Sequence, residues 1–333
     1  MQDEFDVIDR YFAGFSQSDL VRLGPGDDCA ILAPPSGDDV VVSTDTLAAG
    51  VHFPQDASGN IVVQRALGAN LSDLAAMGAN PMAVLSALTL PEAEDGFLQD
   101  LSDTFRRECD RWQVPLVGGN LCQGPLSITL TVIGTVPSGS ALCRNGARVG
   151  DDLYVSGTLG DAAAGLQYLA NPVNARDVPD NVAKALIDRY ERPVPRLAVG
   201  QKLRPLASAA IDISDGFSSD LVHLCQASGV DATVELADLP VSEALSRLFP
   251  DERDQLALHG GDDYELCFTA DPEHRDVIDG LSSSLGLTLT RVGSMGVAGG
   301  GAPLTFLRNG QITKAGSGGY RHFSRADDTG GTR

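Results

Sequence analysis

GPGDD, at residues 24–28, lies directly before the apolar run at residues 29–33. It places two adjacent carboxylates, Asp27 and Asp28, on a turn that has a glycine on either side of Pro25. Two carboxylates about 4 Å apart repel each other by about 4 kcal/mol at an effective dielectric constant of about 20. Further acids gathered at the same place would therefore need a cation.

Three more acidic segments lie at the ends of predicted helices or strands: residues 44–46 (TDT), 70–73 (NLSD) and 212–215 (DISD). Each combines carboxylate oxygens with hydroxyl or amide oxygens. Mg²⁺ prefers such ligands and is usually held by one or two carboxylates together with substrate phosphates and water. A single aspartate is more readily explained as a turn former or helix cap, whereas the four groups together indicate several metal ions.

The length and composition are those of a two-domain enzyme with an aliphatic core. The chain has 333 residues, of which 43% are hydrophobic but only 5% aromatic, and domains commonly have roughly 150 residues. No stretch is long and apolar enough to predict a membrane span, and the acidic N-terminus lacks the basic and apolar parts of a secretory signal. We therefore expect a cytoplasmic protein with no membrane partner.

The formal charge of −21 argues against a nucleic-acid partner, because binding to phosphate backbones depends on Lys and Arg. The six cysteines include no C-x-x-C pair. This spacing favours reduced thiols over a zinc site or a disulfide framework.

Apolar periodicity predicts alternating helices and strands, which is typical of α/β or α+β layers. An amphipathic helix is expected near the N-terminus, with Phe5, Ile8, Phe12 and Phe15 on one face. Turn residues between 137 and 150 predict a domain boundary. Further helices are predicted at residues 60–77, 94–112, 161–169, 182–190, 195–203, 215–227, 242–248 and 272–281, and strands at 29–33, 40–43, 82–90, 114–117, 126–136, 152–156, 209–213, 232–236, 264–269, 287–293 and 303–307.

The usual phosphate-binding motifs are absent. The sequence has no GxxxxGK[ST] motif, no V-A-I-K strand and no H-R-D loop, which disfavours P-loop NTPases and protein kinases. The remaining candidates for phosphate binding are metal ions, amides of a glycine loop at residues 118–120, and the guanidinium of Arg144. His52 taken alone is most simply a surface histidine, and the acidic turn at residues 260–265 could be only a turn.

In order along the chain, GPGDDCA, STDTL, GVHF, NLSDLAAMGANP, VGGN, CRNGA, IDISDGFSSDL, GGDDYELCF and GYRHF resemble the thiamine-monophosphate kinase family. The resemblance covers nearly the whole chain. It implies the two-domain fold of enzymes related to aminoimidazole ribonucleotide synthetase, with mixed sheets covered by helices. Residues 1–137 would form an N-terminal ATP-binding, metal-binding and dimerisation domain, residues 148–322 a C-terminal α/β domain, and residues 323–333 a flexible tail.

The resemblance also implies an activity: direct in-line transfer of the γ-phosphoryl group of ATP to thiamine monophosphate. The reaction would depend on several Mg²⁺ ions, with K⁺ as a further candidate ion, and the protein would be a homodimer joined through its N-terminal domains. No residue is assigned as general base, because the acceptor phosphate is already largely ionised near neutral pH.

Roles are carried over position by position from the family. The predicted metal ligands are Asp28, Ser43, Thr44, Asp45, Asp73, Asp212 and Asp215. The predicted nucleotide contacts are Gly119, Arg144 and Ser214, and the predicted acceptor contacts are His52, Asp262 and Tyr320.

Two positions depart from the family pattern. The family's GGDT reads GGNL here, so that Asn120, assigned to both metal and nucleotide, can offer an oxygen but no charge. Asp262 stands where the family has glutamate, which shortens the reach by one methylene. Asn120 leaves open a non-catalytic or impaired nucleotide- or thiamine-phosphate-binding protein. Another ATP-using synthetase of the superfamily is the remaining alternative, although selenophosphate synthetase would need a reactive Cys near a Lys before Cys29.

Overall fold

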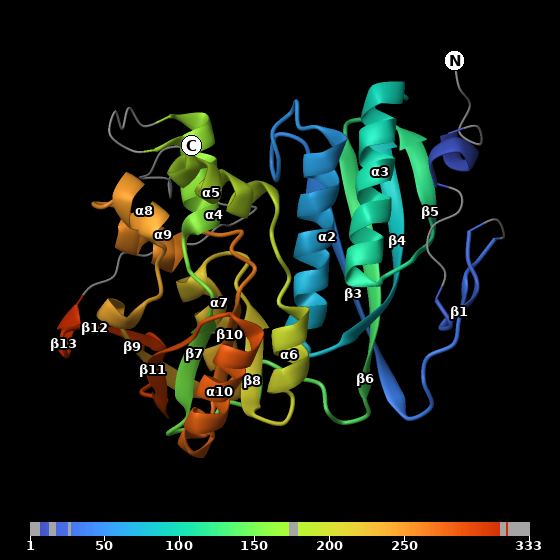
Figure 1. Cartoon of the computed structure of the whole chain (residues 1–333). Helices are drawn as coiled ribbons and strands as arrows, with labels where there is room; N and C mark the ends of the chain where they lie inside the picture. Colours follow the sequence, from blue (N-terminus) through green and yellow to red (C-terminus); the bar gives the residue numbers. More distant parts are fainter. Residues whose placement is uncertain (1–6, 13–17, 26–27, 173–178, 314–317, 319–333) are drawn as a thin grey trace.

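The computed structural model describes residues 7–12, 18–25, 28–172, 179–313 and 318. They form two layered halves that lie side by side, each with its own sheet (Figure 1). This arrangement confirms the predicted mixed α/β fold class. The domain limits at residues 137 and 148 remain a prediction.

The first half contains a four-stranded sheet whose helices cover only one face (Figure 1). Strand β6 pairs antiparallel with both of its neighbours, β3 and β4, whereas the edge strand β5 runs parallel to β4. In sheet order the strands are β3 (Asp38–Ala48), β6 (Ser127–Pro137), β4 (Asn80–Leu90) and β5 (Leu116–Gln123), and the covering helices are α2 (Gly59–Ala76) and α3 (Asp95–Trp112).

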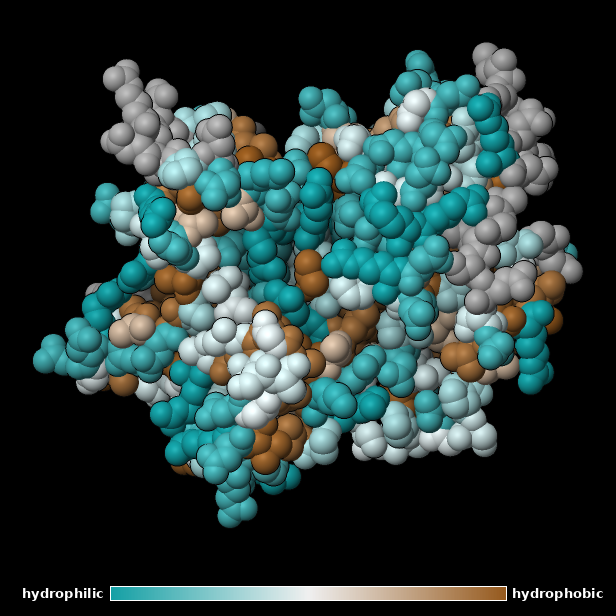
Figure 2. All heavy atoms as spheres, viewed as in Figure 1, coloured by the Kyte–Doolittle hydropathy of each residue, from teal (hydrophilic) through white to brown (hydrophobic). Residues whose placement is uncertain are grey.

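Helix α2 is buried on nearly all sides because it lies between this sheet and the second half. Its N-terminus is capped by Ser58, whose side chain accepts a hydrogen bond from the Ile61 amide. On the other side, Gly200 of α6 (Leu197–Leu203) approaches so closely that an added Cβ would come within 1.9 Å of the Ala75 carbonyl oxygen. Helix α3 instead exposes a hydrophilic outer face (Figure 2).

The second half is built on a seven-stranded mixed sheet, in which only β12 and β9 pair in parallel. Its strands, in sheet order, are β13 (Gln311–Thr313), β12 (Leu304–Arg308), β9 (Val230–Glu235), β11 (Leu289–Val297), β7 (Asp152–Ser156), β10 (Leu266–Ala270) and β8 (Ala207–Asp212). The remaining helices are α4 (Asp161–Ala170), α5 (Asp180–Glu191), α7 (Phe217–Ser228), α8 (Glu243–Leu248), α9 (Arg253–His259) and α10 (Arg275–Leu285), with 3-10 turns η2 (Leu236–Asp238) and η3 (Pro272–His274).

Several predicted elements differ from the structure. In the described part of the opening segment, the chain forms a short π-helix, η1 (Ile8–Phe12), followed by the hairpin of β1 (Val21–Leu23) and β2 (Ile31–Leu32). Strands β1 and β13 and helix α9 were not predicted. The glycine loop expected at residues 118–120 was wrong, because those residues continue β5 and pair with β4.

Within the described residues, no helix combines the length and apolar character that a membrane span requires.

Candidate active site

Three aspartates from three different elements converge at the seam between the halves. The Ser43 hydroxyl of β3 donates a hydrogen bond of 2.5 Å to Asp73 Oδ2 of α2. One residue before Asp73, the Ser72 hydroxyl donates at 2.7 Å to Asp212 Oδ2, at the end of β8. The Asp45 amide donates to Asn70 Oδ1 at 3.1 Å, which ties the same strand to the same helix. Helix α2 therefore presents the predicted residues of both halves to one place.

Burial and mutual repulsion disfavour the ionised form of these carboxylates. Burial, with a smaller contribution from the nearby Asp45, raises the pKa of Asp73 to about 6. Burial, followed by the charge of Asp73, raises the pKa of Asp212 to about 7, whereas Arg144 lowers the pKa of both groups. Repulsion of this kind is relieved by a cation.

The donor set has the chemistry of a Mg²⁺ site, since it consists of carboxylate and hydroxyl oxygens. Among the described residues, no three His, Cys, Asp or Glu side chains already stand at metal-binding spacing. This is compatible with Mg²⁺, which takes only one or two carboxylates directly and completes its shell with phosphate and water.

A cavity of about 500 Å³ opens over this cluster, within the size range of ligand-binding pockets. It brings Arg144, the single predicted phosphate-binding guanidinium, to the same space as Asp73 and Asp212. The cavity is lined by Val41, Val42, Ser43, Asp73, Leu74, Ala76, Met77, Cys143, Arg144, Asn145, Ala210 and Asp212.

Ser214 and Asp215 form the turn from β8 into α7, directly after Asp212. Their backbone amides both donate to Asp220 Oδ2, at 3.0 and 3.1 Å. Asp220 is buried in the first turn of α7, and burial together with Asp212 and Asp215 raises its pKa to about 7. Asp220 therefore holds the turn that carries two predicted site residues.

The predicted acceptor residues His52 and Asp262 meet through a third side chain. Arg65 of α2 donates to the His52 carbonyl oxygen at 2.8 Å and lies 2.9 Å from Asp262 Oδ1. The Asp262 amide in turn donates to the Ser214 carbonyl oxygen at 2.9 Å, so the acidic turn abuts the turn after β8. Tyr320 lies outside the described residues.

The other acids of GGDDYEL stabilise the fold. Asp263 accepts hydrogen bonds from the Gly160 and Ala162 amides at the start of α4, at 2.6 and 3.2 Å. Glu265 is fully buried and pairs with Arg189 and Arg196.

Not all predicted ligands join this cluster. The Thr44 hydroxyl points to the opposite face of β3, where it donates to the Leu130 carbonyl oxygen at 2.9 Å. Asn120 stands in register with Ala87, Thr129 and Thr46 across the sheet. Three strand spacings of about 4.8 Å separate Thr46 from Asn120, or roughly 14 Å.

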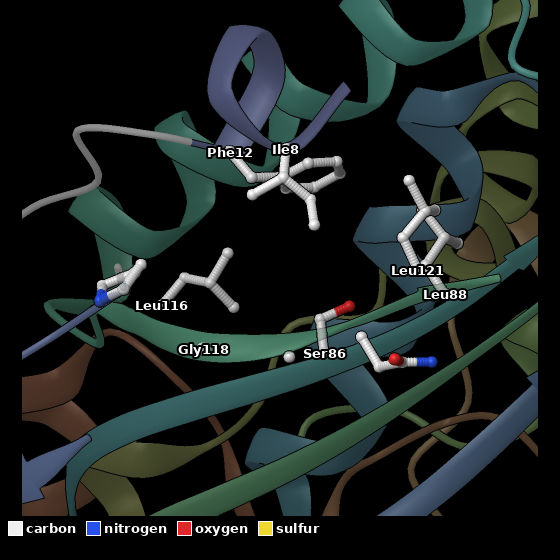
Figure 3. Close-up of a pocket in the computed structure, with 10 residues that line it drawn as sticks. Ile8, Phe12, Ser86, Leu88, Leu116, Gly118 and Leu121 are labelled. Carbon is white, nitrogen blue, oxygen red and sulfur yellow. The ribbon is translucent and has the colours of Figure 1, made fainter. Parts of the chain in front are cut away.

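Gly119 and Asn120 instead line a small pocket at the β5 edge (Figure 3). Ile8 and Phe12 point from η1 toward β5 and close the pocket over Leu116. Its volume of about 80 Å³ and its apolar walls do not suit a nucleotide. Pro25 lines the same pocket, and Asp28, three residues later, is exposed. Within one chain, the predicted metal ligands thus fall into two groups.

Family models match both halves. The N-terminal domain of AIR synthase related proteins matches residues 26–136, and the C-terminal domain matches residues 148–303. The thiamine-monophosphate kinase of Escherichia coli K12 is 46% identical over 323 residues, which cover 96% of this chain and 98% of that protein. The chain belongs to the thiamine-monophosphate kinase family, within the AIR synthase related proteins.

More distant members and solved structures agree. The Bacillus subtilis thiamine-monophosphate kinase is 32% identical, with 87% of this chain and 90% of that protein covered. The crystal structure of the Stenotrophomonas maltophilia K279a enzyme superposes with a TM-score of 0.81 at 41% identity, covering 89% of this chain and 93% of that one. AaThiL complexed with AMPPCP and TMP superposes with a TM-score of 0.76 at 30% identity, covering 87% and 89%.

Two residues that organise this site were not singled out by the sequence motifs. Arg65 and Asp220 were both missed, although Asp220 lies inside the motif IDISDGFSSDL. Its position in the first turn of a helix, after a turn rich in amides, was the available signal. Arg65 offered none, because its partners are distant in sequence.

Proposed function

We propose that this chain is a thiamine-monophosphate kinase that transfers the γ-phosphoryl group of ATP to thiamine monophosphate. The observation that carries the proposal is the convergence of Asp73, Asp212 and Arg144 on one cavity, in a chain whose relatives at up to 46% identity are thiamine-monophosphate kinases. AaThiL, a related structure, holds AMPPCP and TMP.

Asp45, Asp73 and Asp212, with the Ser43 hydroxyl, would hold Mg²⁺. Bound there, Mg²⁺ would neutralise phosphate charge and stabilise the charge that develops during transfer. The further proposed metal ligands are Asp28, Thr44, Asn120 and Asp215. K⁺ is proposed as an additional ion.

The remaining chemistry falls to positioning by the protein. The Arg144 guanidinium, which lines the cavity, can form two parallel hydrogen bonds with a phosphate. Ser214, two residues after Asp212 and fixed by Asp220, is proposed to contact the nucleotide. Aligning donor and acceptor in one site makes the transfer effectively unimolecular. No side chain needs to remove a proton, because the acceptor phosphate is already ionised.

His52, Asp262 and Tyr320 are proposed to bind the acceptor. An acidic group is suited to the positively charged thiazolium ring. Gly318 supports the inclusion of Tyr320, because an added Cβ on Gly318 would meet His259 Cγ at 2.7 Å. His259 precedes the 260–265 turn by one residue, so the chain reaches this turn two residues before Tyr320.

We further propose a cytoplasmic homodimer, joined through the sheet face that α2 and α3 leave uncovered. Val40 and Val42 of β3 are 48% and 61% exposed, and Asn120 lies in register on the same sheet. Pairing two copies through this face would bury these side chains. It would also place residues from the β5 edge near the interface, as expected for an ATP site close to it.

A coupled assay for ADP release with ATP, Mg²⁺ and thiamine monophosphate tests the proposed function, with thiamine diphosphate identified by chromatography. We expect ADP and thiamine diphosphate in equal amounts, and loss of both on chelation of Mg²⁺. ADP release that does not require thiamine monophosphate would favour another synthetase of the superfamily.

Asn120 is the observation that favours the alternative of an impaired or purely binding protein. Restoring the acid with Asn120→Asp adds a charge without changing the side-chain length, so we expect a higher apparent affinity for Mg²⁺ and a faster turnover. Titrating the initial rate against Mg²⁺ measures both. Binding of ATP analogues and thiamine monophosphate by calorimetry, without turnover in either variant, would support the binding protein instead.

A further inference from the structure

Arg65 links the two halves at the predicted acceptor end of the site. Its side chain is only 2% exposed. Besides its contacts with His52 and Asp262, the guanidinium lies 4.0 Å from the centre of the Tyr190 ring and donates to the Tyr190 carbonyl oxygen. One buried cation thereby joins α2, the His52 loop, the end of α5 and the turn before β10.

The turn that carries Asp262 depends on such outside contacts. Asp262 and Tyr264 have φ angles of 69° and 50°, in the left-handed region that residues other than glycine adopt only when their surroundings hold them. Backbone bonds fix the turn on one side, since the Tyr264 amide donates to the Ile213 carbonyl oxygen at 2.9 Å. The side chain of Asp262 is fixed by its ion pair with Arg65.

Both side-chain contacts of Asp262 fall on the same carboxylate oxygen. Oδ1 is 2.9 Å from Arg65 Nη2 and accepts a hydrogen bond from the Tyr264 hydroxyl at 3.2 Å. The Asp262 side chain is 28% exposed. Because Oδ1 carries both of these contacts, Oδ2 is the oxygen left to meet a ligand. Arg65 thus determines which oxygen faces outward and how far it stands from the His52 loop.

We propose that Arg65 is a positioning residue for the acceptor: it holds Oδ1 of Asp262 and the His52 backbone, so that Oδ2 is presented to a hydrogen-bond donor or positive charge of the acceptor. This inference rests on the proposed function, because it assigns the acceptor to His52 and Asp262. It concerns affinity for the acceptor and leaves the nucleotide end of the cavity unaffected.

Arg204 offers a matched control. It too is an arginine at the seam, and its Nη1 donates to the Gly78 carbonyl oxygen at 3.0 Å. This contact lies just beyond the C-terminal end of α2, whereas Arg65 lies near its N-terminal end. An arginine that only stabilises the seam should behave alike at both positions.

The test measures the KM for thiamine monophosphate, the KM for ATP, kcat and the melting temperature for wild type, Arg65→Met, Arg65→Lys and Arg204→Met. We expect Arg65→Met to raise the acceptor KM by about tenfold or more, because it removes the ion pair of Asp262 and leaves Oδ1 only the Tyr264 hydroxyl, with the ATP KM within about twofold of wild type. Arg65→Lys keeps the charge but loses the planar guanidinium that contacts several partners at once. Its acceptor KM should therefore lie between the values for wild type and Arg65→Met. Arg204→Met should lower the melting temperature without changing either KM.

An Arg65→Met variant with an unchanged acceptor KM, or with both KM values raised alike, would overturn the inference. If Arg65→Met does not fold, Tyr264→Phe, which removes the second contact on Oδ1, should still raise the acceptor KM selectively, and an unchanged KM there would count against it. Calorimetric binding of thiamine monophosphate to each variant separates this inference from the proposed function: wild type that binds but does not turn over refutes the function alone, and wild type that does not bind refutes both.

Discussion

Asp73 and Asp212 connect acidity, metal binding and stability at the scale of single residues. Their folded pKa values, about 6 and about 7, lie above the usual value of 3.8. The folded state therefore binds more protons than the unfolded state between about pH 4 and these values. The contribution of each group is most favourable below about pH 4 and is lost as the pH rises through its folded pKa.

In EDTA, we therefore expect the free energy of unfolding to fall between pH 4 and pH 7, by up to about 1.4 kcal/mol per pH unit for each additional proton bound. Asp212→Asn should flatten this slope and should lower kcat by about a thousandfold, because a charge at the reacting phosphates is lost. Urea unfolding at a series of pH values measures the slope. The exposed Asp56→Asn serves as control, and an Asp212→Asn variant with the wild-type slope would contradict the assignment.

At the scale of elements, β5 depends on a single glycine. A Cβ on Gly119 would come within 1.9 Å of the Ser86 carbonyl oxygen on β4, whereas one on Gly118 would meet only Leu85 Cδ2, at 3.5 Å. We expect Gly119→Ala to destabilise the protein by about 1–3 kcal/mol, as overpacking does elsewhere, and Gly118→Ala to be much milder. Thermal unfolding compares them. Equal melting temperatures for the two variants would show that the β4–β5 pairing adapts.

The same strand shows where sequence reasoning ends. Helix α2 was predicted within a residue of its observed ends, because small and aliphatic residues dominate from Asn60 until Gly78 ends the stretch. Gly118-Gly119-Asn120 was predicted as a loop, because two glycines usually interrupt a strand, and only the close pairing with β4 explains them.

The candidate site also contains residues that motifs predict and residues that only the folded structure reveals. Motifs were sufficient to group Asp45, Asp73 and Asp212. They could not reveal Arg65, whose contacts with Tyr190 and Asp262 span 125 or more residues. Nor could they separate Asn120 from the other predicted ligands, because that separation depends on the order of strands in the sheet.

At the scale of the whole molecule, the two groups of predicted ligands raise the question of a second copy. In the chain as described, the seam unites Asp73 with Asp212, while Asn120 stands at the far edge of the sheet. A dimer formed through the uncovered sheet face would bring the edge of one copy toward the other. Oligomerisation and activity should then be lost together.

Val40→Asp places a charge on that face at its β3 edge, where Val40 is 48% exposed in the single chain and lies outside the lining of the active-site cavity. Burying an unpaired carboxylate is costly, so we expect Val40→Asp to be a single 34.8 kDa chain at micromolar concentration and to lose most of its activity. Val277→Asp, on α10 with 52% exposure, is the control and should remain a dimer like the wild type. Light scattering coupled to gel filtration gives the mass of each variant. A monomeric wild type, or a dimeric Val40→Asp with full activity, would exclude this face as the interface.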